Sequence, residues 1–254
     1  MKKNFLLFLM LSIIIGSTSC KKTFDVVSSE KVNSYAPLEV GKYIMYQLDS
    51  TVFTNLGASK EVHSYVIKDT IQSITTDNIG RKAYSIIRLL RNKIDTNNWT
   101  HVDAYLAIAD STTLEWVESN RRFIKMKAPI KTGFSWKGNT YINTISVPEA
   151  SYLHDWTYTY ETINTPIKLN NQIIPSAISI LQRNDTIGDP SNKKVYSEIN
   201  YSKEMYGKNT GLIFKEFLHQ VWQPGNANNA SGYFEENSYG IKISILRHNF
   251  STLR

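Results

Sequence analysis

The sequence contains a single cysteine, Cys20. It therefore excludes intramolecular disulfides, zinc sites built from several cysteines, and any other cysteine nucleophile. Proline and glycine are also scarce, with 7 and 12 residues among 254, and no low-complexity stretch occurs, which excludes a collagen-like or disordered chain. The remaining composition, 41% apolar and 12% aromatic, is that of a globular protein able to bury a sizeable core.

The sequence also lacks an apolar run long enough to span a membrane. Its longest run extends from Phe5 to Ile15, after two N-terminal lysines and before the small residues 16–19. A spanning helix needs roughly 20 apolar residues, whereas a run of about 10 to 14 followed by small residues is typical of a cleaved secretory signal. We therefore expect residues 1–19 to be a signal peptide.

Small residues directly before a cysteine resemble the lipobox of bacterial lipoproteins, in which the cysteine is lipidated and becomes the first residue of the mature protein. This sequence departs from the lipobox at Ser17, where an aliphatic residue is usual. We nevertheless interpret Cys20 as the lipid attachment site, because the single cysteine of the chain stands at the end of the signal region. An anchor of several acyl chains stabilises membrane binding by about 0.8 kcal/mol per buried CH₂, so no further span is needed. Lys21 follows the cysteine, where an inner-membrane retention signal would have Asp, so we expect sorting to the outer membrane. The sequence does not distinguish the periplasmic face of that membrane from its surface face.

Neither sign of charge dominates the mature chain. The formal net charge of +7 falls to +5 once the two lysines of the signal peptide are removed. Charges of both signs are scattered along the sequence, which does not indicate a nucleic-acid footprint. We expect the partners to be the membrane, through the anchor, and a lipid, a glycan or an envelope protein, with no nucleic acid.

Alternation of apolar and polar residues predicts strands along most of the chain. Between Val40 and Phe53, for example, Ile44, Tyr46 and Leu48 recur at even positions. Asn, Asp and Gly separate successive segments, so neighbouring strands should pair antiparallel. The expected strands are 40–53, 63–75, 82–94, 99–109, 113–118, 122–128, 154–163, 167–174, 177–182, 211–222 and 239–247.

These segments predict an all-β, mostly antiparallel fold of about ten to thirteen strands, a sandwich or a barrel. Because no linker rich in Pro, Gly or Ser divides residues 35–254, we expect one domain there, preceded by a polar tether over 20–34. A short helix or an irregular segment that interrupts the sheet is expected at 196–206. In the segment after Arg121, Phe123, Lys125 and Lys127 should form a solvated face opposite an apolar one. The alternative is that this basic face, with Arg121, is a docking surface for phospholipid headgroups or an anionic polymer.

Two tyrosine-rich segments stand near the start and the end of the mature chain. The first is Tyr35-Ala36-Pro37-Leu38 with Gly41, Tyr43 and Tyr46, and the second is Tyr206 with Gly211-Leu212-Ile213-Phe214-Lys215-Glu216. Together they resemble the opening and closing signatures of a family of uncharacterised exported lipoproteins of Gram-negative bacteria, although such proteins often have Trp where Tyr43 stands. The resemblance implies an envelope location and a β-rich fold, and it implies no activity.

No motif of a cofactor, metal or nucleophilic site is present. The five histidines are far apart without metal-ligand spacing, and the sequence has neither a G-x-S-x-G elbow nor a glycine-rich phosphate loop. We therefore expect no cofactor and no catalytic residue that can be named. A glycan- or lipid-acting hydrolase remains an alternative, because two carboxylates facing each other across a cleft would suffice. The available acids are Glu115, Glu118, Asp155 and Glu161.

Two groups of residues are candidates for ligand binding. Trp156, Tyr158 and Tyr160 form an aromatic stripe on one face of a strand, and such a stripe stacks on sugars, lines an apolar cavity or simply packs the core. His101 and Asp103 share a strand face and suit a polar ligand, although ordinary surface residues give the same pattern. The leading hypothesis is a non-enzymatic binding or interaction module of the envelope, with a hydrolase or a structural spacer as alternatives.

Overall fold

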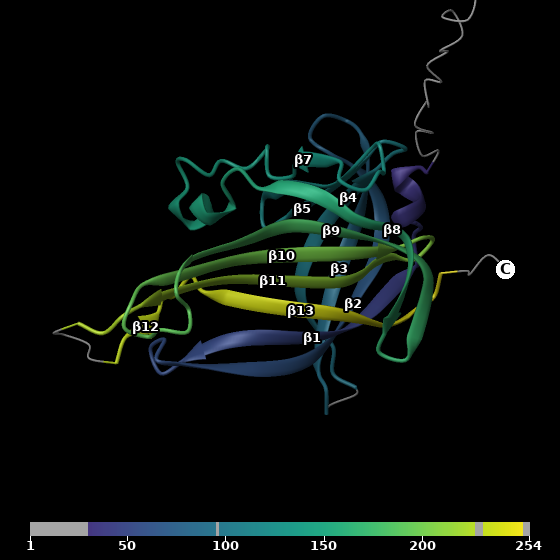
Figure 1. Cartoon of the computed structure of the whole chain (residues 1–254). Helices are drawn as coiled ribbons and strands as arrows, with labels where there is room; N and C mark the ends of the chain where they lie inside the picture. Colours follow the sequence, from purple (N-terminus) through teal and green to yellow (C-terminus); the bar gives the residue numbers. More distant parts are fainter. Residues whose placement is uncertain (1–29, 95–96, 227–230, 251–254) are drawn as a thin grey trace, which may run out of the picture.

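The structure is a computed structural model that describes residues 30–94, 97–226 and 231–250. Its described part contains thirteen strands in one sheet and two short 3₁₀ helices, η2 (Val32–Tyr35) and η3 (Pro148–Leu153) (Figure 1). The expected signal peptide and Cys20 lie outside the described residues. The strands are β1 (Tyr43–Thr54), β2 (Ser59–Thr76), β3 (Lys82–Asn92), β4 (Thr100–Ala109), β5 (Thr113–Glu118), β6 (Arg121–Lys127), β7 (Ser135–Lys137), β8 (Thr157–Leu169), β9 (Gln172–Gly188), β10 (Ser197–Gly207), β11 (Gly211–Gln223), β12 (Tyr233–Phe234) and β13 (Tyr239–His248).

The strands form a nearly closed antiparallel barrel. Their order is β6-β5-β4-β3-β2-β1-β13-β11-β10-β9-β8-β7, with the short β12 beside β11. The two ends of this order meet, because the Ile124 amide on β6 donates to the Gly138 carbonyl next to β7 at 2.8 Å. The Trp136 indole of β7 donates in turn to the Ile124 carbonyl, also at 2.8 Å. The predicted all-β fold is confirmed, and the architecture is the barrel.

The helix predicted at 196–206 is wrong. Residues Ser197–Gly207 form β10, which pairs with β9 on one side and β11 on the other. Its buried positions include the polar Ser202 and Glu204 as well as Tyr206. Because polar side chains occupy some of the buried positions, apolar and polar residues do not alternate along this segment, and the sequence does not predict a strand here.

The solvated face predicted for β6 is also wrong at two of its three residues. Phe123 is buried and Lys125 is only 2% exposed, whereas Lys127 is exposed as expected. The register shifts between Leu114 and Glu115 where β5 pairs with β6. Consecutive residues of β6 are therefore buried, and a lysine is enclosed within the barrel.

The two 3₁₀ helices lie at opposite ends of the barrel, with η2 in purple and η3 in teal in Figure 1. At the η2 end, Val32 is fully buried within the segment expected to be a tether, and Asn209 donates its amide to the Ser34 carbonyl at 2.7 Å. The Tyr46 hydroxyl donates to the Leu212 carbonyl at 3.0 Å, so the two tyrosine-rich segments of the sequence meet here. In the part of the chain that the structure describes, no helix has the length and apolar character needed to cross a membrane.

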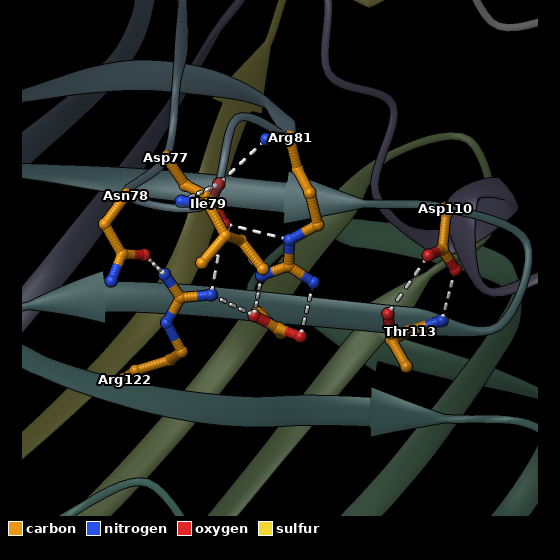
Figure 2. A network of polar contacts seen from close by, with 8 residues as sticks. Asp77, Asn78, Ile79, Arg81, Asp110, Thr113 and Arg122 are labelled. Carbon is orange, nitrogen blue, oxygen red and sulfur yellow. Dashed lines mark hydrogen bonds and ion pairs between the residues drawn. The ribbon is translucent and has the colours of Figure 1, made fainter.

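A compact charge network holds the β2–β3 turn against β5 and β6. Arg81 binds Glu115 through both guanidinium ends, at 3.0 and 2.6 Å, and donates to Asp77 at 2.9 Å. Arg122 of β6 joins it by donating to Glu115 at 2.7 Å and to Asn78 at 2.8 Å. Figure 2 shows the guanidinium groups turned toward Asp77. Bidentate arginine contacts of this kind fix geometry, and here they position the two strands that carry Glu118 and Lys125.

Candidate ligand-binding site

The barrel interior contains several charged side chains in addition to apolar and aromatic ones. Asp69 of β2 and Arg88 of β3 form a bidentate pair at 2.7 Å for both contacts, and the Tyr105 hydroxyl donates to the same carboxylate at 2.8 Å. Buried charges of opposite sign are stable when they are paired and fully hydrogen-bonded in this way. The opposite charges of Asp69 and Arg88 therefore compensate each other.

A second group of charges lies around Glu204 of β10, which is fully buried. One carboxylate oxygen accepts a hydrogen bond from Lys125 at 2.9 Å, and the other accepts one from the Tyr206 hydroxyl at 2.7 Å. Burial opposes ionisation of Glu204, but the nearby Lys125 and Lys215 outweigh this effect and lower its pKa. Glu204 is thus an anion whose two oxygens both have partners.

Lys215 of β11 is paired less closely. Its side chain is 12% exposed, and its ammonium lies 3.7 Å from Glu118 and 3.9 Å from Glu204, beyond ordinary hydrogen-bond distance. Burial lowers the pKa of Lys215, and the positive charge of Lys125 adds to that effect against the attraction of Glu118. The ammonium group consequently retains capacity for a further acceptor.

A cavity of about 110 Å³ opens beside these lysines under η3. The exposed Ser119 lies on its lining together with the partly exposed Tyr239, so the cavity communicates with solvent. Tyr152 of η3 also lines it and is held on the barrel by stacking on His219, with ring centres 4.1 Å apart. The aromatic and charged lining residues are Tyr152, Trp156, Tyr158, Phe123, Phe217, Tyr239, Glu118, Arg121, Lys125 and Lys215.

Gln182 of β9 is also among the residues that line the cavity. It is 2% exposed, its Oε1 accepts a hydrogen bond from the Ser202 hydroxyl at 2.7 Å, and its Nε2 has no hydrogen-bond partner. Reversing the amide would leave Oε1 without a partner instead, so one polar atom stays unpaired in either orientation. An unpaired buried polar group costs roughly 1–3 kcal/mol, and a ligand that paired with it would recover part of this cost.

The three aromatic residues singled out from the sequence all lie inside the barrel. Trp156 and Tyr158 line the cavity, and Trp156 stacks on Phe217 with ring centres 5.9 Å apart. Tyr160 is fully buried away from it, where its hydroxyl donates to the Lys127 carbonyl at 3.0 Å. Two of the three residues therefore line the cavity, while Tyr160 lies in the packed core, and a role in ligand binding stays a prediction.

His101 and Asp103 do not join this cavity. Both are on β4, where His101 is exposed and the Asp103 carboxylate accepts the amide hydrogen of its neighbour Ala104 at 2.8 Å. Within the described ranges no group of three or more His, Cys, Asp or Glu side chains is arranged to hold a metal ion. The role suggested for these two residues stays a prediction.

The four acids considered for a hydrolase do not form an acid–base pair. Burial raises the pKa of Glu115 and Glu118, but the arginines beside Glu115 and the lysines beside Glu118 outweigh it, so both pKa values are lowered, that of Glu118 to about 2. Neither carboxyl is therefore the protonated acid that glycoside hydrolysis needs near neutral pH. Asp155 and Glu161 are separately ion-paired, with Lys137 at 2.7 Å and with Lys203 at 2.8 Å.

Lys125, Lys215 and Gln182 were not predicted as site residues. One sequence signal was available for Lys215, because it shares its strand face with Ile213 and Phe217, both of which are buried. A charged residue between two core positions of a strand indicates a buried charge with a partner or a ligand.

No protein-family model and no curated protein matches this chain. Among solved structures, the chain is similar to a crystal structure of a domain from Vibrio parahaemolyticus described as an outer membrane lipoprotein-sorting protein. The two share 8% sequence identity with a TM-score of 0.21, over 87% of this chain and 91% of that chain. At this level the similarity carries no conclusion about function.

Proposed function

We propose that this chain is an exported lipoprotein, attached to a membrane through Cys20, whose barrel binds a small ligand in the cavity under η3. The observation that carries the binding role is the cavity itself. It combines an aromatic wall with a weakly paired lysine and an unpaired buried amide, Lys215 and Gln182. Ligand sites in proteins have this composition, with many apolar side chains and a few placed polar groups.

The size of the cavity limits what it holds. Its volume of about 110 Å³ lies below the roughly 300–1,000 Å³ of pockets that enclose a drug-sized molecule. An engineered cavity of about 150 Å³ binds benzene, so a space of this order accommodates one ring or a group of similar size. The ligand is accordingly a small molecule, or one end of a larger molecule that extends through the mouth.

Indole NMR signals test the binding role. The contacts described above lie within residues 30–250, so protein lacking residues 1–20 keeps them. Benzyl alcohol, a neutral one-ring probe, is expected to shift the indole resonance of Trp156, which lines the cavity. Trp222 serves as the internal control, since its indole donates to the Lys193 carbonyl away from the cavity. If Trp156 does not shift at any probe concentration, with benzyl alcohol or with benzoate, the cavity is not a ligand site.

A further inference from the structure

The charges that face the cavity favour an anion. Lys125 lines it, but its ammonium donates a hydrogen bond to Glu204, a buried residue that is not part of the cavity lining. The remaining charged lining residues are one carboxylate, Glu118, and two cations, Lys215 and Arg121. The wall thus presents more positive than negative charge to a bound molecule. In a site partly shielded from water such an excess is compensated by a ligand of negative charge.

Two hydrogen-bond donors supplement this charge. Among the described residues, the closest carboxylate to the Lys215 ammonium is that of Glu118 at 3.7 Å, and the Nε2 atom of Gln182 has no acceptor. A carboxylate supplies two oxygens, and hydrogen bonds from a cation to a carboxylate are shorter and stronger than neutral ones. A carboxylate would therefore satisfy both groups, whereas an amine would compete with Lys215 for Glu118.

The apolar part of the wall defines the rest of the ligand. Trp156 and Phe217 are stacked at 5.9 Å, and Phe217 and Tyr239 are stacked at 4.8 Å, so a continuous aromatic surface leads from the interior to the mouth. Flat rings pack well against such a surface. The limited volume admits about one ring.

We infer that the ligand of this cavity is a small organic carboxylate whose apolar part is about the size of one ring, with its carboxylate toward Lys215 and Gln182. This inference rests on the proposed binding role and adds the charge and size of the ligand. Arg121 at the cavity lining adds a further attraction for the incoming anion.

Three probes with the same ring and different charges test the inference. Benzoate, benzyl alcohol and benzylamine are titrated into the protein lacking residues 1–20, with calorimetry for affinity and the Trp156 indole signal for location. Benzoate is expected to bind at least about tenfold more tightly than benzyl alcohol, since a hydrogen bond between charged groups is roughly twice as strong as a neutral one. Benzylamine is expected to bind most weakly, because the positive wall repels it.

Substitution of Lys215 tests the assignment to a residue. Lys215→Met should bring the benzoate affinity to within about threefold of the benzyl alcohol affinity measured on the same variant, because the charged contact is lost. Lys242→Met removes an exposed lysine from the neighbouring strand β13 and should change neither affinity. The comparison of the three probes on unsubstituted protein does not depend on how well either variant folds.

The outcomes separate the inference from the binding role. Equal affinities for the three probes at Trp156, or a preference for benzylamine, would overturn the charge assignment while the cavity remained a ligand site. A benzoate preference that persists in folded Lys215→Met would overturn the role of Lys215. Failure of all three probes to shift Trp156 would overturn the binding role and the inference together.

Discussion

At the scale of single residues, the interior charges contribute to stability and to the proposed binding of a ligand. Glu204 is fully buried and holds Lys125 at 2.9 Å and Tyr206 at 2.7 Å, so its removal would leave a buried ammonium without its closest anion. Removing one partner of a buried ion pair is far more costly than removing both. The interior charges therefore depend on one another, and among those described above Lys215 has the longest distances to its partners, 3.7 Å to Glu118 and 3.9 Å to Glu204.

Replacing Glu204 tests this dependence. Glu204→Leu is expected to lower the free energy of unfolding by about 3–5 kcal/mol, measured by urea denaturation, because Lys125 is left uncompensated. The double variant Lys125→Met/Glu204→Leu should regain at least half of that loss. Asp185→Asn is the control, since Asp185 is 42% exposed in its pair with Arg183, and it should change stability by less than about 0.5 kcal/mol. A Glu204→Leu variant as stable as the unsubstituted protein would contradict the account.

At the scale of elements, the contact between β6 and β7 closes the barrel. β7 has only three residues, and it is held to β6 by the Ile124–Gly138 backbone bond and the Trp136 indole. Gly138 is required for a steric reason. A Cβ atom at this position would lie 2.4 Å from the ring of Tyr158, a residue of the cavity wall. The closure and the ligand site therefore share a packing contact.

Gly138→Ala is expected to destabilise the protein by about 1–3 kcal/mol, the usual cost of forcing extra atoms into a packed core. Because Tyr158 must move, the affinity for benzyl alcohol should fall as well. Ser135→Ala, on the exposed side of β7, should stay within about 0.5 kcal/mol of the unsubstituted protein. Urea denaturation and the Trp156 indole titration measure the two effects. Unchanged stability in Gly138→Ala would show that this closing contact is looser than the distances indicate.

The elements also show how far the sequence predicts the fold and the site. β5 was predicted with its observed bounds, because apolar residues alternate along Thr113–Glu118. β10 was missed because Ser202 and Glu204 stand at buried positions, and β7 is too short for any alternation to show. The aromatic residues at every second position of 156–160 also single out Trp156 and Tyr158 as candidate ligand-binding residues. The place of Lys215 between Ile213 and Phe217 indicates a buried charge, but the cavity beside it is formed by contacts between distant strands, which the sequence does not show.

At the scale of the whole molecule, the barrel is proposed to be tethered to a membrane at its η2 end. The chain enters the described structure at Glu30 and continues into η2, whereas the cavity lies under η3 at the opposite end.

Cys20→Ala tests the anchor. This variant should appear in the soluble fraction after processing, or accumulate with an uncleaved signal peptide, when membranes are separated from the lysate and immunoblotted. The replacement of Ser17 by Leu, which restores the usual lipobox residue, should preserve membrane attachment. A processed Cys20→Ala protein that remains in the membrane fraction would contradict lipid anchoring.

The most direct measurement is a crystal structure of the protein lacking residues 1–20 soaked with 4-bromobenzoate, in which anomalous scattering locates the bromine. The account predicts one bromine peak along the aromatic surface of Trp156 and Phe217, with the carboxylate within hydrogen-bond distance of Lys215 and Gln182. A cavity that stays empty while the compound binds elsewhere, or a carboxylate turned outward from Lys215, would contradict it.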